Sequence, residues 1–99
     1  MKIKGSKNNV IVEGNLIFDN AQQAREALLS KLGKLTDDKE VTIDLSQVTE
    51  IDSSGIQLLI SFFKSLDKHK FRYKINGITD EIMEILNLAG IIKYFKIEV

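Results

Sequence analysis

The chain of 99 residues is long enough for one domain and too short for two, and its 43% hydrophobic content suits a globular fold with a small core. Lysine plus arginine and aspartate plus glutamate number 14 each, so a formal net charge of zero gives no global attraction to nucleic acid or to an anionic membrane. The absence of cysteine excludes disulfides and thiol chemistry, and no apolar run approaches the roughly 18 residues that span a bilayer, so we expect a cytoplasmic domain without membrane insertion.

The N-terminal third predicts a strand pair followed by a helix. Residues 1–4 read as a short strand or a frayed end. In Asn9–Phe18, apolar residues stand on either side of Glu13–Asn15, which is typical of a hairpin turn because glycine and asparagine tolerate positive φ. Asp19 and Asn20 are then expected to cap a helix. The predicted core stripe of this helix is Ala21, Ala24, Leu28 and Leu32, and the helix is expected to stop at Gly33. The predicted solvated face carries Arg25, Glu26, Lys31 and Lys34.

The middle of the chain predicts a strand, a small polar junction and an amphipathic helix. Glu40–Leu45 alternates apolar and polar residues, as in a strand buried on one face. At the junction, Asp52 or Ser53 is the expected N-cap, and Gly55 allows the helix to pack closely. The helix is predicted from apolar residues at helical spacing, namely Ile56, Leu59, Ile60, Phe63 and Leu66.

The last third predicts a strand, a helix and a final strand. Phe71–Ile75 alternates cleanly, which indicates one face in water. Thr79 is expected to cap a third helix, with Asp80 and Glu81 in its first turn. The expected core stripe of that helix is Ile82, Ile85, Leu86 and Ala89, and Gly90 is its expected C-terminal stop. Tyr94–Glu98 closes the chain as a short strand.

This order of strands and helices predicts an α/β fold, a single domain over residues 1–99. Strands that alternate with helices form a mostly parallel sheet through right-handed crossovers. Because several strands have a polar face, we expect a mixed sheet with helices packed mainly on one side.

Catalysis by a serine is the first functional alternative, and the residues disfavour it. A nucleophile elbow requires Gly-x-Ser-x-Gly, but Ile51 stands where Ser53 would need the first glycine. His69, the single histidine, is expected in an exposed turn beyond a helix of about 12 residues, about 18 Å away. We therefore predict a protein that is not an enzyme.

Paired carboxylates offer two further candidate sites. Asp44 and Asp52 are expected near one end of the sheet, but so short a chain leaves no cleft to surround an acid and base pair. Asp37 and Asp38 share a polar loop, but no further oxygen ligands follow at EF-hand spacing. The sequence therefore predicts no metal and no cofactor.

Nucleic-acid binding is the second alternative, because basic residues surround two aromatic ones. The stretch contains Lys64, Lys68, Lys70, Phe71, Arg72, Tyr73 and Lys74. Strand alternation turns the aromatic residues toward the core and the basic residues toward water. We interpret the stretch as a solvated edge and predict no nucleic-acid partner.

A hydroxyl at an exposed helix start instead suits regulation by phosphate. The unpaired N–H groups and the dipole of a helix N-terminus stabilise negative charge. Phosphorylation adds about −1.5 to −2 charges, and burying them against a carboxylate or an apolar surface of a partner would cost on the order of several kcal/mol. That is enough to abolish a complex of about micromolar affinity.

The motif Asp52-Ser53-Ser54-Gly55, between the strand Thr42–Ser46 and an apolar helix, resembles the signature of the STAS family, of the anti-sigma factor antagonist type. The similarity runs from the strand at Val10 to Asn87–Ile91. It implies a non-enzymatic bacterial transcription regulator that binds an anti-sigma factor serine kinase, is phosphorylated by it on Ser53, and is reset by a serine phosphatase.

The resemblance also implies roles for the neighbouring residues. Asp52 would shape the phosphoacceptor site, Ser54 would hydrogen-bond at the helix start, and Gly55 and Ile56 complete the site that meets the partner. Phosphorylation of Ser54 would preserve the switch and move the site by one residue. Gln57–Leu59 is more similar to STAS proteins of chemotaxis and lipid-transport operons, which implies an alternative, a constitutive protein-binding subunit of a signalling or ABC transport complex.

Overall fold

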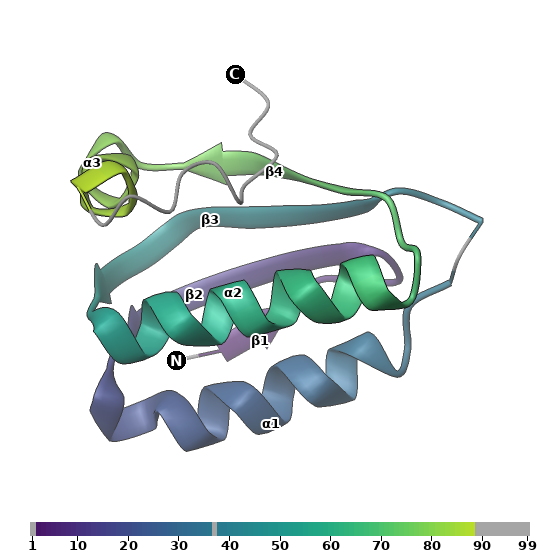
Figure 1. The fold of residues 1–99 in the computed structure, drawn as a ribbon, viewed down its shortest axis with the longest axis horizontal. Helices are drawn as coiled ribbons and strands as arrows, with labels where there is room; N and C mark the ends of the chain where they lie inside the picture. Colours follow the sequence, from purple (N-terminus) through teal and green to yellow (C-terminus); the bar gives the residue numbers. More distant parts are fainter. Residues whose placement is uncertain (1, 37, 89–99) are drawn as a thin grey trace.

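One sheet with the strand order β1-β2-β3-β4 carries the helices of the protein (Figure 1). The computed structural model describes residues 2–36 and 38–88. The strands are β1 (Lys2–Lys4), β2 (Asn9–Leu16), β3 (Val41–Ile51) and β4 (Tyr73–Ile78). The helices are the 3-10 helix η1 (Phe18–Asn20) and the α-helices α1 (Ala21–Leu32), α2 (Ser53–Lys68) and α3 (Asp80–Leu88). The predicted strand Tyr94–Glu98 and the helix end at Ala89 and Gly90 lie outside the described residues.

The sheet is mixed and mostly parallel, as predicted. β1 pairs antiparallel with β2, whereas β2, β3 and β4 are parallel to one another. The crossovers place α1 and α2 side by side on one face, running in the same direction, and α3 lies beyond the end of β4 (Figure 1). The three parallel strands therefore end at one edge of the sheet, where the chain enters η1, α2 and α3.

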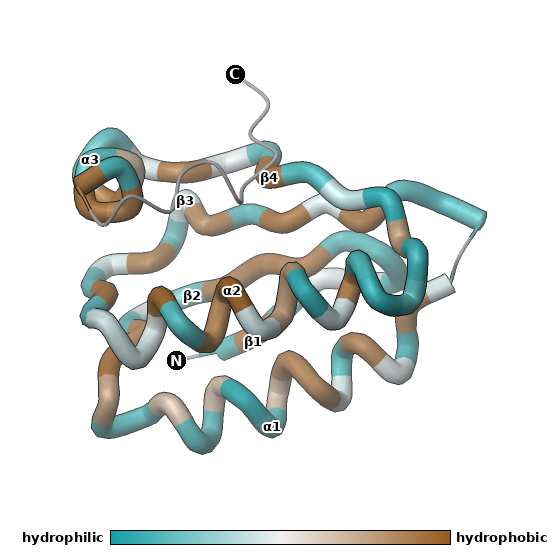
Figure 2. Tube along the Cα trace, viewed as in Figure 1, coloured by the Kyte–Doolittle hydropathy of each residue, from teal (hydrophilic) through white to brown (hydrophobic). Residues whose placement is uncertain are grey.

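The core lies between the sheet and the pair α1 and α2. The predicted alternation is confirmed along β3 and β4, where every second side chain is buried at the start of each strand. Figure 2 shows these hydrophobic residues along the strands and along α2. The buried core residues of the strands and of these two helices are Val10, Val12, Leu16, Val41, Ile43, Leu45, Val48, Ile51, Tyr73, Ile75, Ala24, Leu28, Leu59, Phe62, Phe63 and Leu66.

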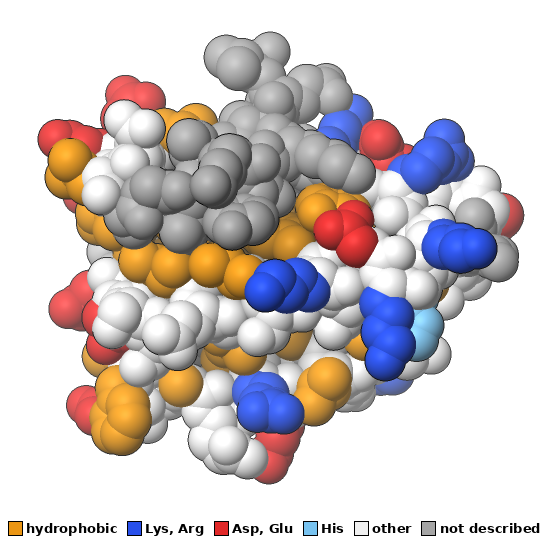
Figure 3. Space-filling view, in the orientation of Figure 1, with side chains coloured by type: hydrophobic (Ala, Val, Ile, Leu, Met, Phe, Trp, Pro, Cys, Tyr) orange, Lys and Arg blue, Asp and Glu red, His pale blue; other side chains and the backbone are white. Residues whose placement is uncertain are grey.

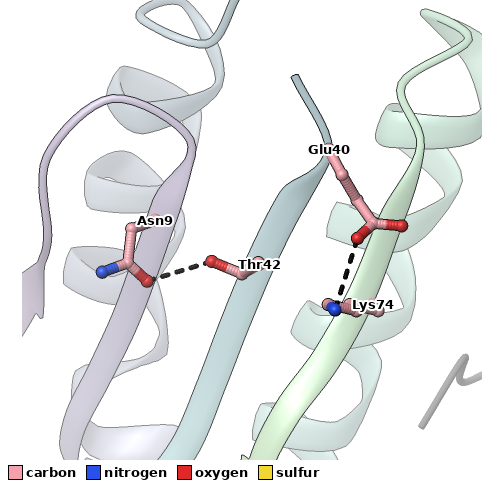
Figure 4. A network of polar contacts seen from close by, with 4 residues as sticks. All are labelled: Asn9, Glu40, Thr42 and Lys74. Carbon is pink, nitrogen blue, oxygen red and sulfur yellow. Dashed lines mark hydrogen bonds and ion pairs between the residues drawn. The ribbon is translucent and has the colours of Figure 1, made fainter. Parts of the chain in front are cut away.

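Polar contacts join neighbouring strands at the edge of the sheet where β3 begins (Figure 4). The Thr42 hydroxyl donates to the Asn9 side-chain oxygen over 3.1 Å. The Lys74 ammonium lies 3.6 Å from the Glu40 carboxylate. Thr42 and Lys74 alternate along their strands with buried residues, so this polar side chain pattern agrees with the expectation of one wet sheet face.

The predicted hairpin turn at Glu13–Asn15 is wrong, because β2 runs without interruption through these residues. Gly14 does have a positive φ of 97°, as a turn would require, but it lies at a register shift between β2 and β3. Some β-bulges and some turns both place a glycine at positive φ, so Gly14 indicated an irregularity of the strand as well as it would indicate a turn. The actual turn joins β1 to β2 and contains Gly5 and Lys7, both at positive φ.

Strand β3 and helix α2 are both longer than predicted. β3 continues six residues past Leu45, to Ile51. The sequence pattern missed this extension because Ser46 and Gln47 are both exposed and break the alternation before Val48 is buried again. α2 extends to Lys68 and buries Phe62 together with Leu59, Phe63 and Leu66, whereas Ile56 and Ile60 are half-buried.

The helix caps agree with prediction at one end and differ at another. The Thr79 hydroxyl accepts the Ile82 N–H over 3.2 Å, which confirms the predicted cap of α3. Ile85 of that helix is 36% exposed, so its predicted place in the core is wrong. Asn20 occupies the N-cap position of α1, but its side chain accepts from the Ile17 N–H and makes no cap bond to α1. It stabilises the preceding turn instead.

Candidate functional site

The Asp52 side chain caps α2. Its Oδ1 accepts hydrogen bonds from the Ser54 N–H over 2.9 Å and from the Gly55 N–H over 3.2 Å. A carboxylate in this position satisfies N–H groups that have no partner within the helix, and its charge complements the helix dipole. Of the two predicted N-caps, Asp52 is therefore the one used, and Ser53 is the first residue of the helix.

The same carboxylate also holds the end of β2. Its Oδ2 accepts from the Phe18 N–H over 2.9 Å, and the Asp52 N–H donates to the Leu16 carbonyl over 3.2 Å. The bond from Phe18, followed by the bonds from Gly55 and Ser54, lowers the pKa of Asp52 below its ordinary value. Asp52 is thus a charged clamp between the turn after β2 and the start of α2.

Gly55 brings the first turn of α2 against the end of β2, as predicted. A Cβ atom at this position would overlap the Leu16 carbonyl oxygen and press on the Leu16 side chain. Gly55 is buried against β2, and a larger side chain at position 55 would have to push α2 away from the sheet. The glycine and the Asp52 clamp therefore fix the helix start from two sides.

The two serines of the motif differ in their surroundings. Ser53 is exposed, and no hydrogen bond joins its hydroxyl to another residue within 2–36 and 38–88. Ser54 is half-buried and lines a groove between α1 and α2. Ile56 is half-buried in the first turn of the helix. Of these three residues, Ser53 is therefore the most accessible to another macromolecule.

Acidic residues surround this end of the protein. Asp19 lies in η1 after β2, Glu50 lies near the end of β3, and Asp52 caps α2, while Asp80 and Glu81 lie in the first turn of α3. Residues 17–20, 50–54 and 79–82 contain no lysine or arginine. Figure 3 shows acidic side chains toward the side where α2 begins and basic side chains toward the side where it ends. The predicted basic edge is exposed at that opposite side, at Lys64, Lys68, Lys70 and Arg72. The site is therefore locally negative in a chain without net charge.

The other predicted candidates lie away from Ser53. His69 is exposed and directly follows α2, at the opposite end of the helix. The expectation that Asp44 and Asp52 share one end of the sheet is wrong: eight residues of extended chain, about 3.3 Å each, separate them by about 26 Å along β3. The Asp44 side chain instead accepts from the backbone and hydroxyl of Ser46.

Two residues beside the site were not recognised from the sequence. The sequence predicts Phe18 inside a strand, but this residue is 75% exposed in η1. Arg25 is exposed, as predicted for a solvated face, and it also lines the groove next to Ser54. The available signal for Phe18 was its place directly before the predicted helix cap at Asp19 and Asn20, where the strand has to end.

Two general features of the described chain bear on the kind of site. No helix within residues 2–36 and 38–88 has the length and apolar character needed to cross a membrane. Across the same residues, no three His, Asp or Glu side chains gather as they would around a metal ion.

Comparison with known proteins identifies the family of this chain. A protein of Listeria monocytogenes named anti-sigma-B factor antagonist is 24% identical over 83 residues, which cover 84% of this chain and 71% of the relative. The structure of an anti-sigma factor antagonist from Mycobacterium paratuberculosis has a TM-score of 0.76 at 18% identity, over 97% of this chain and 81% of the other. The Bacillus cell fate determinant SpoIIAA in its phosphorylated form has a TM-score of 0.66 at 14% identity, over 99% and 90%. The model of the STAS domain family matches residues 2–99, and the chain belongs to this family, as the motif at Asp52–Gly55 predicts.

Proposed function

We propose that this protein is a non-enzymatic anti-sigma factor antagonist that binds an anti-sigma factor serine kinase and is switched off by phosphorylation of Ser53. The observation that carries the proposal is the exposed Ser53 hydroxyl at the first residue of α2, without a hydrogen-bond partner in the described part of the chain. Such a hydroxyl is accessible to a kinase and can be modified without breaking an existing contact.

The names of the relatives support the same function. The curated relative from Listeria is an anti-sigma-B factor antagonist, and SpoIIAA of the same fold has a structure in its phosphorylated form. These names belong to other proteins of low sequence identity. We propose the same function for this chain because it shares their fold and carries the motif Asp52–Gly55. A serine phosphatase would complete the cycle by restoring the binding form.

The surroundings of Ser53 explain how a phosphate would act. The N–H groups of Ser54 and Gly55, which could bind a phosphate, already donate to Asp52. A phosphate on Ser53 would therefore remain in solvent and add about −1.5 to −2 charges beside Asp52 and Glu50. The fold would persist, while a partner that buries this end would meet a strongly negative surface.

The same geometry favours a regulatory role for Ser53 and disfavours a role as the nucleophile of a hydrolase. Ser53 and His69 lie at opposite ends of α2, and the 16 residues of this helix span about 24 Å. No histidine can therefore activate the serine in a triad. We propose a cytoplasmic protein that binds other proteins and acts without a nucleic-acid partner, metal or cofactor.

The first experiment is phosphopeptide mass spectrometry of the protein isolated from its own host, over the segment from Val41 to Lys64. We expect phosphate on Ser53. Phosphate on Ser54 would move the site by one residue. A segment that stays unmodified in every growth condition, with phosphatases inhibited, would contradict the switch and favour a constitutive subunit of a signalling or transport complex.

Variants then connect the modification to binding. The serine kinase of the same host, purified with nucleotide, should bind the parent and Ser53→Ala alike, and Ser53→Ala should not be released by ATP. Ser53→Asp should bind at least tenfold more weakly, with Asn76→Asp as the control for an added charge at an exposed position of β4, away from the start of α2. Equal binding of Ser53→Asp and the parent would contradict the mechanism.

A further inference from the structure

Two adjoining hollows between α1 and α2 form one continuous depression, which we call the α1–α2 groove. The hollow beside the start of α2 has a volume of about 280 Å³, and the next one along the helices has about 150 Å³. Arg25, Leu58 and Ser61 line both hollows. The groove therefore runs lengthwise between two helices that lie side by side in Figure 1.

The groove is apolar along much of its length. Leu28 and Phe62 line it as part of the buried core, and Leu58 is half-buried. Its borders carry two of the large hydrophobic side chains that the described surface exposes, Phe18 at 75% and Leu29 at 52%. Such exposed apolar side chains around a depression are typical of a surface that another protein covers.

Arg25 gives the groove a single unpaired charge. No carboxylate lines either hollow, and Arg25 makes no ion pair or hydrogen bond with the rest of the described chain. A guanidinium that a partner desolvates costs free energy unless it meets an acceptor, and a carboxylate binds it in bidentate fashion. The groove is thus complementary to apolar side chains that carry one carboxylate.

We propose that the α1–α2 groove receives an α-helix of a partner protein, with aliphatic side chains on one face and one Asp or Glu that pairs with Arg25. A helix seated between two others has the geometry of a three-helix packing and of helix-in-groove recognition. The 12 residues of α1 correspond to about 18 Å, so about three turns of the partner helix fit along the groove.

This inference rests on the proposed function for the identity of the partner, the anti-sigma factor serine kinase, and adds where and how that partner binds. Ser54 lines the groove, and Ser53 stands next to it at the start of α2. A phosphate on Ser53 would therefore lie at the mouth of the groove, where it repels an incoming helix that carries a carboxylate. Repulsion between the phosphate and that carboxylate would supply the off state of the switch.

Binding of the purified host kinase to groove variants tests the proposal. We expect Arg25→Glu and Leu29→Asp to weaken binding at least tenfold. Arg72→Glu, which changes an exposed charge outside the groove, should stay within twofold of the parent. Unchanged circular dichroism and melting temperature would show that the variants are folded, and parent-like binding by folded Arg25→Glu would overturn the proposal.

Photo-crosslinking identifies the segment that occupies the groove. Benzoylphenylalanine at Gln22 or Ser61, which line the hollow next to Ser54, should crosslink to one helix of the kinase, and the same group at exposed Asn76 should not. Reversing the charge of the Asp or Glu in that helix should restore the binding of Arg25→Glu. Crosslinks to a second copy of this chain, or to a segment without a carboxylate, would overturn the proposal.

The two sets of variants separate the groove from the switch. If Ser53→Asp weakens binding and Arg25→Glu does not, the proposed function stands and the groove does not receive the kinase. If Arg25→Glu weakens binding and Ser53→Asp does not, the groove is the docking surface and phosphorylation of Ser53 does not control it.

Discussion

The Asn8 side chain holds the backbone of Thr36 through two hydrogen bonds. Its Oδ1 accepts from the Thr36 N–H over 2.9 Å, and its Nδ2 donates to the Thr36 carbonyl over 2.6 Å. The Nδ2 also donates to the Lys39 carbonyl over 2.7 Å, although Asn8 is only 5% exposed. One buried amide therefore ties the turn after β1 to the loop that connects α1 with β3.

Replacement of this amide should destabilise the protein. In Asn8→Ala, three backbone groups of Thr36 and Lys39 lose their partner, and at about 1 kcal/mol for each hydrogen bond we expect a loss of about 2–4 kcal/mol in the free energy of unfolding. Urea denaturation measures it. Asn9→Ala is the control, since Asn9 is exposed and its side chain accepts from the Thr42 hydroxyl, so its loss should stay below about 1 kcal/mol. Equal losses of unfolding free energy in Asn8→Ala and Asn9→Ala would show that the buried hydrogen bonds of Asn8 add no more stability than the exposed bond of Asn9.

Gly55→Ala should be more harmful than Gly33→Ala. Its Cβ would overlap the Leu16 carbonyl oxygen, which belongs to the backbone and cannot rotate away. We expect a loss of about 1–3 kcal/mol from overpacking. At Gly33 the nearest atom would lie 3.6 Å from an added Cβ and φ is −67°, so Gly33→Ala should be neutral or stabilising by up to about 1 kcal/mol. Calorimetric melting of both variants provides the comparison.

The Asp52 clamp should make stability dependent on pH in the acid range. The pKa of Asp52 is lowered in the folded protein by the N–H groups of Phe18, Gly55 and Ser54, so its contribution is fully present above the unfolded pKa of about 3.9. It is lost as the pH falls through the lower folded pKa. The difference in unfolding free energy between the parent and Asp52→Asn should therefore be constant above about pH 5 and shrink below it.

A control for this pH series is Asp19→Asn. It removes an exposed carboxylate that accepts no side-chain hydrogen bond within the described residues. At pH 6, Asp19→Asn should therefore lose less unfolding free energy, measured by urea denaturation, than Asp52→Asn, because no hydrogen bond comparable to those of Asp52 is lost. A difference for Asp52→Asn that does not vary with pH would contradict the role of the clamp.

A negative charge should be tolerated by the fold at Ser53 and less so at Ser54. At Ser53 the attraction of the helix dipole and the repulsion from nearby carboxylates oppose each other, so we expect Ser53→Asp to stay within about 0.5 kcal/mol of the parent. Ser54 is half-buried, and Ser54→Asp should cost more than about 1 kcal/mol because a charge loses solvation there. A larger loss for Ser53→Asp would mean that phosphate acts by unfolding the helix start.

Local patterns in the sequence were sufficient for the order of elements and for the helix start, and insufficient for contacts between distant segments. The Asp52 cap and the Thr79 cap follow from bonds two or three residues long, and both are confirmed by their hydrogen bonds. The bond from Phe18 to Asp52 joins residues 34 apart, and no periodicity encodes it. Gly14 was misassigned because its positive φ serves equally in a turn and in a bulge, and only the pairing of β2 with β3 distinguishes the two.

The separation of charge along α2 makes a chain of zero formal net charge strongly polar in space. An approaching protein with a basic surface would feel a torque that turns the acidic end, with Ser53, toward it before contact. The rate of association should then fall as salt is added, even though the net charge predicts no such effect. Phosphorylation would enlarge this dipole, so the modification that we propose to block docking would also strengthen the attraction of an enzyme that has a cationic site and removes the phosphate.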